Sequence, residues 1–221
     1  MYHLAKKHFK KADPVLHQAA QQWVIEESPL SRDLFRDIVW TIVGQQLSSL
    51  AANAIFARFQ KLFARGRRAG QSPLGGAITP STVLKLDDAK MRACGLSGAK
   101  TRAIKHFAEA VQRGALDIKA LPLSSDEIVI AELTKVKGIG PWTAQMVLMF
   151  SLSRPDVFSP GDLGLRKGVM LLYGLKTFPS DKKLLAMVRK WSPYRTYAAR
   201  ILWKVADANK NRTPRKRPGT Q

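Results

Sequence analysis

The sequence has almost no cysteine, no long apolar run and few acidic residues. Its single cysteine, Cys94, excludes a disulfide framework, a four-cysteine zinc site and a four-cysteine iron–sulfur cluster. No apolar run approaches the roughly 20 residues of a membrane-spanning helix, and the opening MYHLAKKHFKKADP lacks the apolar centre of a signal peptide. We expect no metal bound by side chains and no required cofactor, because metal-ligand spacing is missing among the four histidines, His3, His8, His17 and His106.

Positive charge is what the sequence has in excess. Lys and Arg number 37 against 16 Asp and Glu, a formal net charge of +21 at pH 7, and 45% of the residues are hydrophobic. A globular chain with this charge typically binds nucleic acid, and less often an anionic membrane surface. We therefore expect an intracellular, polyanion-binding protein that is monomeric and does not associate with membranes.

Helix signals dominate the chain. Asp13 and Pro14 are typical of a helix N-terminus, residues 32–63 predict two helices that meet near Gly44, and Ser124 with Glu127 has the pattern of a capping box. Further helices are expected within 80–114, after Gly140, after Asp162, after Ser180 and across 194–208. No alternating run with turn signals on both sides indicates a strand, so the predicted fold class is all-α.

Two segments differ from this helical pattern. Residues 64–77, ARGRRAGQSPLGGA, are predicted to form a loop rich in glycine and arginine. Residues 209–221 form a basic, proline-containing tail that we expect to be disordered. The folded domain is therefore expected to span residues 1–208, with the N-terminal segment returning to the C-terminal half.

The stretch VKGIGPWTAQ, residues 136–145, predicts a tight turn between two helices, a hairpin over about residues 133–144. The amides after its two glycines would lie at the positive end of a helix, where they can bind a phosphate without a side chain in the way. We therefore predict DNA-backbone contacts at Lys137, Gly138, Ile139 and Gly140. An ordinary helical hairpin with a glycine C-cap gives the same pattern, and the net charge favours DNA.

Four segments together resemble the helix-hairpin-helix (HhH-GPD) DNA glycosylases, and among them the AlkA-type 3-methyladenine enzymes. They are LTKVKGIGPWTAQMV, DVFSPGDLGLRK, IVGQQLSSLAA and SPYRTYAARILW, and the resemblance covers residues 12–208. It implies two helical subdomains flanking a DNA-binding cleft, in a compact form without the extra N-terminal domain of some relatives. It also implies an enzyme that flips an alkylated base out of double-stranded DNA and cleaves its N-glycosidic bond.

Asp162 occupies the position of the family's catalytic aspartate. By analogy with glycoside hydrolysis, its carboxylate would stabilise an oxocarbenium-like sugar. A helix N-cap is the structural alternative, and the two roles are compatible. Where lyase-competent members have a lysine nucleophile, this chain has Trp142, so the resemblance implies a monofunctional enzyme that leaves an abasic site.

The resemblance places Trp142, Met146 and Trp203 around the flipped base. Alkylation at N3 or N7 puts positive charge on a purine, and an electron-rich aromatic wall binds such a cation selectively. Met146 stands where the family often has an aromatic residue. The structural alternative for Trp142 and Trp203 is a place in the core.

Gln46 stands where the family inserts a wedge, often leucine, into the space left by the flipped base. Its alternative is a buried amide at a helix end. Lys100 and Arg102, in GLSGAKTRAI, match a turn that would meet backbone phosphate, with a solvated basic face as the alternative. The family often binds Na⁺ or K⁺ through hairpin carbonyls, which here are those of Thr134, Val136 and Ile139.

Two other functions stay open at this point. One is a glycosylase for oxidised, deaminated or mismatched bases, and the other is a non-catalytic hairpin module that only binds DNA. Asp162 and the paired tryptophans count against the second, since a binding module needs neither. The compartment expected is the bacterial cytoplasm, or the nucleus if the source is a eukaryote.

Overall fold

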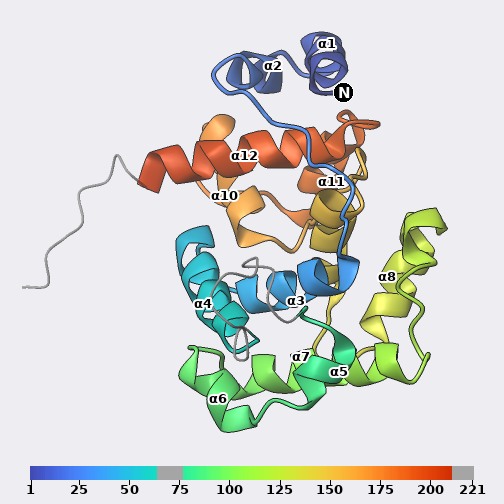
Figure 1. Cartoon of the computed structure of the whole chain (residues 1–221). Coiled ribbons are helices and arrows are strands. Elements are labelled where there is room, and N and C mark those ends of the chain that lie inside the picture. Colours follow the sequence, from blue (N-terminus) through green and yellow to red (C-terminus); the bar gives the residue numbers. More distant parts are fainter. Residues whose placement is uncertain (64–76, 211–221) are drawn as a thin grey trace, which may run out of the picture. The chain divides into compact units, whose positions relative to one another are not determined.

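The computed structural model describes residues 1–63 and 77–210, and every regular element within these ranges is a helix (Figure 1). The all-α prediction is therefore confirmed. The chain divides into two compact units, the first formed by Met1–Ser28 with Ser153–Gln221 and the second by Pro29–Leu152. The N-terminal segment thus packs with the C-terminal part, as expected. Within the described ranges, no helix combines the length and apolarity that crossing a membrane requires.

The first unit combines two helices from the start of the chain with three from its end. They are α1 (Tyr2–Ala12), α2 (Pro14–Ala20), α10 (Leu163–Leu172), α11 (Asp181–Arg189) and α12 (Arg195–Lys210). Helix α1 was not predicted, although Tyr2, Ala5 and Phe9 have helical spacing and are buried. Helix α12 ends two residues beyond the boundary expected at residue 208, and residues 211–221 of the predicted tail lie outside the described part of the chain.

Asp13 ties the N-terminal helices to the C-terminal ones. It caps α2, as predicted, by accepting the Leu16 N–H at 3.1 Å. Its other oxygen accepts the Trp191 indole N–H at 2.9 Å and the Tyr173 hydroxyl at 2.5 Å. Burial, and then the bond to Asp13, raise the pKa of Tyr173 well above its usual value. A buried carboxylate with three donors is satisfied, so it fixes α2 against the ends of α10 and α11.

Helices α10 and α12 approach so closely that one position admits no side chain. A Cβ atom on Gly168 would lie 2.4 Å from the carbonyl oxygen of Leu202 and 2.8 Å from its carbonyl carbon. Backbone atoms cannot rotate out of the way as the end of a side chain can. Gly168 therefore allows α10 and α12 to pack backbone against backbone.

Gly168→Ala is expected to lower the free energy of unfolding by about 3 kcal/mol, because the new methyl group must push the two helices apart. Urea unfolding followed by circular dichroism measures this change. Gly161→Ala is the matched control, since a Cβ on Gly161 would meet nothing within 4 Å. Equal stability of the two variants would show that the helices separate without penalty.

The second unit contains the remaining elements. They are α3 (Leu34–Gly44), α4 (Ser49–Lys61), α5 (Pro80–Leu84), α6 (Asp88–Ala93), α7 (Gly98–Gln112), the 3-10 turn η1 (Leu121–Leu123), α8 (Asp126–Thr134), α9 (Pro141–Met146) and the π-helix η2 (Val147–Ser151). Helix α7 packs on both α3 and α5, and the rings of Phe35 and Phe107 stack at 4.9 Å between α3 and α7. The predicted pair of helices meeting near Gly44 is confirmed by α3 and α4.

The predicted capping box at the start of α8 was wrong by one residue. The N-cap is Ser125, whose hydroxyl oxygen accepts the Ile128 N–H. Ser124 instead donates its hydroxyl to the Ala120 carbonyl at 2.9 Å. Two adjacent serines offer the same capping chemistry, so the preceding turn decides which of them caps the helix. The predicted loop at 64–77 lies outside the described residues except for Ala77.

Candidate active site and DNA-binding hairpin

Asp162 lies at the N-cap of α10 and contacts Trp203 of α12 within the first unit. Its Oδ1 accepts the Leu165 N–H at 2.8 Å and the Trp203 Nε1–H at 3.1 Å. The same carboxylate oxygen therefore both caps α10 and contacts Trp203. Both residues are partly exposed, as a site that receives a ligand requires.

Gly164 makes room for the contact between Asp162 and Trp203. A Cβ atom at Gly164 would lie 3.0 Å from Asp162 Oδ1 and 3.1 Å from Trp203 Cδ1. Gly164 and Gly168 are one helical turn apart, so the same face of α10 admits the indole and the α12 backbone. Gly164 was not among the predicted site residues, although its four-residue spacing from Gly168 is typical of a close helix contact.

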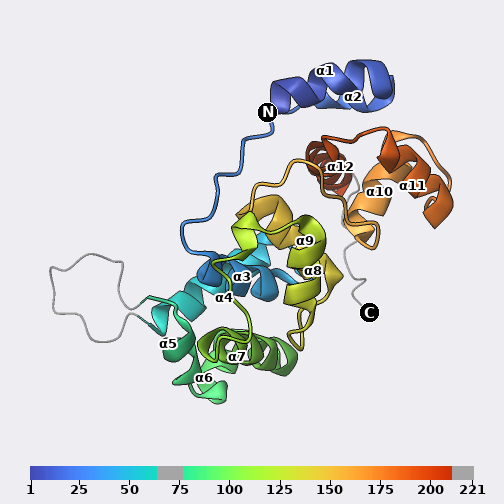
Figure 2. The ribbon, with the colours of Figure 1, turned by 90° about the vertical axis from the view of Figure 1, so that its right-hand side faces the viewer.

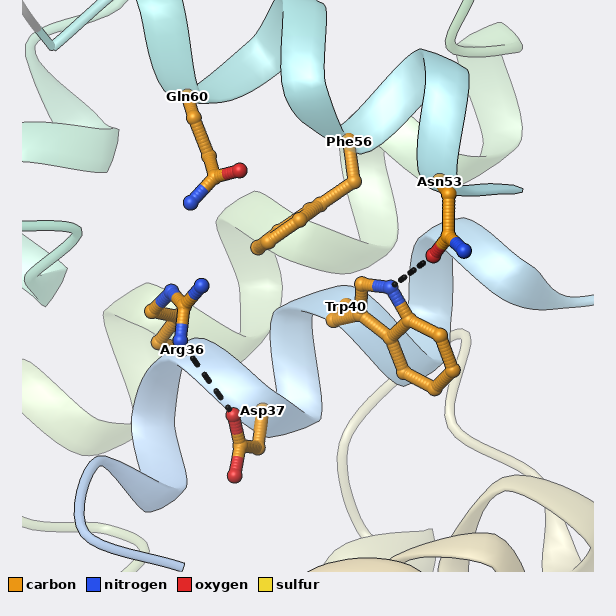
Figure 3. Close-up of a pocket in the computed structure, with 6 residues that line it drawn as sticks. All are labelled: Arg36, Asp37, Trp40, Asn53, Phe56 and Gln60. Atoms are coloured by element: carbon orange, nitrogen blue, oxygen red, sulfur yellow. Dashed lines mark hydrogen bonds and ion pairs between the residues drawn. The ribbon is translucent and has the colours of Figure 1, made fainter. Parts of the chain in front are cut away.

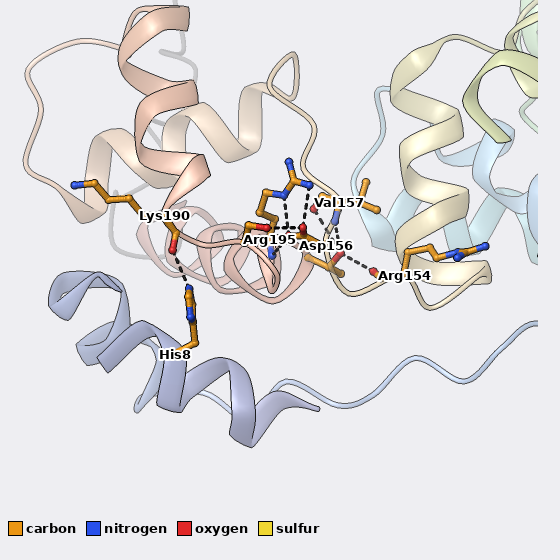
Figure 4. Close-up of polar contacts among 8 residues, drawn as sticks. His8, Arg154, Asp156, Val157, Lys190 and Arg195 are labelled. Carbon is orange, nitrogen blue, oxygen red and sulfur yellow. Dashed lines mark hydrogen bonds and ion pairs between the residues drawn. The ribbon is translucent and has the colours of Figure 1, made fainter. Parts of the chain in front are cut away.

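The loop that leads to Asp162 is held by α12. The guanidinium group of Arg195 binds Asp156 through two hydrogen bonds of 2.7 and 3.0 Å (Figure 4). The Ser192 hydroxyl donates to the same carboxylate at 2.7 Å. Burial acts to raise the pKa of Asp156, but the bonds from Arg195 and Ser192 outweigh it, so this pKa lies below its usual value. The Val157 N–H donates to the Thr196 hydroxyl at 3.0 Å, so the chain is fixed shortly before Asp162.

The predicted hairpin is present as α8, a tight turn and α9, which Figure 2 shows side by side. Gly138 has a φ angle of +97°, and a Cβ atom there would lie 2.4 Å from the Cβ of Ala103 on α7. Both the left-handed backbone and this contact require glycine. The hairpin turn therefore rests directly on α7.

The prediction of which backbone N–H groups bind phosphate needs a correction. The amide after Gly138 belongs to Ile139 and donates to the Val136 carbonyl at 3.0 Å, and the residue after Gly140 is Pro141, which has no N–H. Within residues 1–63 and 77–210, no group accepts the N–H of Gly138 or Gly140. The amides of the two glycines themselves, rather than those that follow them, are thus the candidates for binding phosphate.

Trp142 and Met146 belong to the second unit, one turn apart on α9. Trp142 is partly exposed, whereas Met146 is only 5% exposed. Asp162 and Trp203 belong to the first unit. The contact between Asp162 and Trp203 is thus established, and the arrangement of all four residues around one base stays a prediction.

The other predicted DNA contacts lie in the second unit. Gln46 is exposed and has a φ angle of +57°, so it is not the buried amide of the alternative interpretation. The Lys100 ammonium donates to the Val43 carbonyl at 2.8 Å, and burial lowers its pKa. Arg102 is exposed. Phosphate binding by Lys100 and Arg102 stays a prediction, and Lys100 has in addition a structural role at the end of α3.

The carbonyls predicted to hold Na⁺ or K⁺ are compatible with a cation but do not identify one. The Val136 carbonyl accepts the Ile139 N–H, which leaves one lone pair for another partner. Within the described ranges, no three His, Cys, Asp or Glu side chains are grouped as metal ligands. The cation stays a prediction.

A hollow of about 430 Å³ lies between α3 and α4, and none of the predicted site residues is among those that line it. Figure 3 shows the Trp40 indole beside Asn53, to which its N–H donates at 3.2 Å. The Arg36 guanidinium lies over the Phe56 ring, 5.6 Å from its centre. No role was predicted from the sequence for the residues that line this hollow, which are Arg36, Asp37, Trp40, Asn53, Phe56 and Gln60.

Comparisons with known proteins agree with this architecture. Residues 39–193 match the family described as HhH-GPD superfamily base excision DNA repair protein. The chain is 38% identical over 190 residues to DNA-3-methyladenine glycosylase 1 of Schizosaccharomyces pombe, covering 84% of this chain and 79% of that protein. It is 32% identical over 214 residues to the DNA-3-methyladenine glycosylase of Saccharomyces cerevisiae, covering 80% and 68% respectively.

Among solved structures, the chain is similar to the Schizosaccharomyces pombe 3-methyladenine DNA glycosylase in complex with abasic DNA. The TM-score is 0.75 and the sequence identity 33%, over 90% of this chain and 95% of that one. Together with the helical hairpin and the aspartate at the start of α10, these matches define the class of protein. The chain belongs to the HhH-GPD superfamily of base excision DNA repair proteins.

Proposed function

We propose that this protein is a DNA glycosylase that removes alkylated purines, of the 3-methyladenine and 7-methylguanine type, from double-stranded DNA and leaves an abasic site. The observation that carries the proposal is the Asp162–Trp203 pair, a carboxylate hydrogen-bonded to an indole at 3.1 Å. The names of the relatives support the same substrate class. We further propose that it acts as a monomer.

The proposed reaction is hydrolysis of the N-glycosidic bond. The bond breaks with its electron pair going to the base, which leaves the sugar as an oxocarbenium-like cation. The Asp162 carboxylate stabilises this cation, and the oxygen of a water molecule adds to the anomeric carbon. One proton of that water stays in the new hydroxyl group, and the other passes to bulk solvent. Oδ1 accepts the Leu165 and Trp203 N–H groups, and these two bonds orient the carboxylate.

The aromatic partner accounts for the proposed preference for alkylated bases. A purine alkylated at N3 or N7 has a formal positive charge, and a cation over an indole is stabilised by about 0.5–2 kcal/mol. An unmodified base gains no such term. Loss of a cationic base is also easier, since the base leaves as a neutral molecule.

The absence of a lyase step is part of the proposal. A Schiff base with the sugar needs an uncharged amine beside the reacting carbon, and Trp142 stands where lyase-competent relatives have that lysine. We expect borohydride to trap no covalent complex with lesion DNA, and strands to break only after alkali. Efficient trapping by the wild-type protein would show that another lysine acts as a nucleophile.

A base-release assay on single-lesion duplexes tests the substrate class. We expect release of 3-methyladenine and 7-methylguanine, and much slower release of 8-oxoguanine and of mismatched bases. An unmodified duplex of the same sequence is the control. Preferential release of an oxidised or mismatched base would replace the alkylpurine proposal with the alternative glycosylase activity, and binding without any release would favour a non-catalytic module.

A further inference from the structure

We propose that Gln45 is a positioning residue that holds Gln46 in a fixed position relative to the phosphate-binding hairpin. In this way it determines which base pair is opened relative to the phosphates that the hairpin binds. The inference rests on the proposed function, since it takes Gln46 as the side chain that enters the duplex. All residues involved lie in the second unit.

The Gln45 side chain spans from the end of α3 to the hairpin. Its Nε2 donates to the Gly138 carbonyl at 3.1 Å and to the Thr143 hydroxyl at 2.9 Å. Gly138 lies in the hairpin turn and Thr143 in the first turn of α9, more than 90 residues further along the chain. One amide group thus connects α3 to both parts of the hairpin.

Gln46 follows directly, in a conformation that must be held. Its φ angle of +57° lies in the left-handed region, which is uncommon for a residue with a side chain. The segment is tight on both sides, since the Gln45 N–H donates to Ile42 O and the Leu47 N–H to Gly44 O. Strained residues persist only where their surroundings determine them, and they are concentrated at functional sites.

The hairpin end of this connection is rigid. The peptide group between Gly138 and Ile139 is held on both sides, because its carbonyl accepts the Gln45 amide and its N–H donates to Val136. The preceding carbonyl, of Lys137, lies 3.3 Å from His106 Nδ1. C=O and N–H point in opposite directions across a trans peptide, so the Gly138 N–H points away from His106.

Helix α7 contacts both the end of α3 and the hairpin turn, the two segments that Gln45 connects. Lys100 holds the end of α3 through the Val43 carbonyl at 2.8 Å. Ala103, on the next turn, contacts the Gly138 backbone. The hairpin, with the N–H groups proposed to bind phosphate, and the end of α3, which leads to Gln46, are therefore both attached to α7. The Gln45 side chain forms the direct hydrogen bond between the hairpin and the end of α3.

This arrangement has a consequence for DNA. The hairpin grips phosphates without reading sequence, while a wedge must enter at one base step. If the hairpin and Gln46 keep a fixed offset, binding a given phosphate determines which step is opened. Without the Gln45 bonds, the grip persists but Gln46 no longer has a defined position.

The test uses duplexes with 2-aminopurine beside a tetrahydrofuran abasic analogue, or one position further to either side. Wild-type protein is expected to raise the fluorescence at one position only. Gln45→Leu keeps the side-chain volume but removes the donor. We expect the fluorescence at that one position to fall to the level given by Gln46→Ala, and the neighbouring positions to give a signal as well. We also expect a roughly tenfold slower single-turnover excision of an alkylated base.

Three comparisons separate positioning from support of the fold. Thr143→Val removes one acceptor of the Gln45 amide at a site that is 2% exposed, and it should weaken the fluorescence signal. Thr143→Ser keeps the hydroxyl and should give the wild-type signal. Gln45→Leu should have no further effect in a Gln46→Ala background, because both act on the same step. Affinity for undamaged duplex should change less than about twofold, since phosphate contacts are retained.

Each outcome decides for or against the inference. Independent, additive effects of Gln45→Leu and Gln46→Ala would overturn it, as would a parallel loss of thermal stability and affinity for undamaged DNA. A wild-type protein that gives no fluorescence signal would overturn it too, because Gln46 then does not enter the duplex. A signal that depends on Gln45 in a protein that releases no alkylated base would support the inference and contradict the proposed function.

Discussion

Asp162→Asn is expected to reduce the single-turnover rate of base excision about a thousandfold or more while DNA binding is retained. The substitution removes the negative charge that stabilises the sugar cation, and loss of one well-placed electrostatic group has an effect of this size. Asparagine keeps an oxygen that can accept the Leu165 and Trp203 N–H groups, which are 2.8 and 3.1 Å from Asp162 Oδ1. The helix cap and the fold are therefore expected to survive, with stability changed by less than about 1 kcal/mol.

A matched control for this variant is Asp33→Asn. Asp33 also caps a helix, α3, by accepting the Arg36 N–H at 3.1 Å, so the same chemical change is made at a cap with no role in the reaction. We expect near wild-type excision from Asp33→Asn, and filter binding or fluorescence anisotropy should give similar affinities for both variants. Near wild-type excision by Asp162→Asn would remove Asp162 from the proposed mechanism.

The second large effect is expected for Gly138→Ala. An alanine at a φ of +97° is strained, and its Cβ would lie 2.4 Å from the Cβ of Ala103 and 3.0 Å from its Cα. The backbone strain and the steric clash together should lower the free energy of unfolding by about 3 kcal/mol. Affinity for undamaged duplex should also fall, because the Gly138 N–H moves with the turn. Urea unfolding and anisotropy titrations measure the two effects.

Ala103→Gly provides a partial rescue of Gly138→Ala. It removes the methyl group that the new Cβ would meet, but leaves the left-handed strain and itself weakens α7 by about 1 kcal/mol. The double variant should therefore recover part of the lost affinity for DNA and little of the lost stability. If Ala103→Gly recovers no affinity, crowding against α7 is not what fixes the hairpin.

Local signals in the sequence identified most of the secondary structure. Asp13 and Pro14 start α2 where predicted, since an N-cap and a proline at the first helical position depend only on neighbouring residues. The glycines and proline of residues 138–141 likewise determine the hairpin turn. Where neighbours are chemically equivalent, as Ser124 and Ser125 are, the local signal left an error of one residue.

The candidate site was predictable only in part. Asp162 was found because a motif surrounds it, and its role as an N-cap follows from adjacent residues. The contact of Asp162 with Trp203, 41 residues away, depends on how closely α10 and α12 pack, which Gly164 and Gly168 allow. No local pattern gives such a distance, because it is set by the side chains of two separate helices.

By itself the sequence determined the helical class, the hairpin, the excess of positive charge and the position of the aspartate, because each depends on composition or on residues within a few positions. Only the structure showed that the Ile139 N–H already donates to the Val136 carbonyl, three residues earlier in the same turn. It also decided that Lys100 holds the end of α3 and that Gln45 joins Gln46 to Gly138. The bonds of Lys100 and Gln45 join segments remote in sequence, and they form only when the packed helices bring a donor to an acceptor.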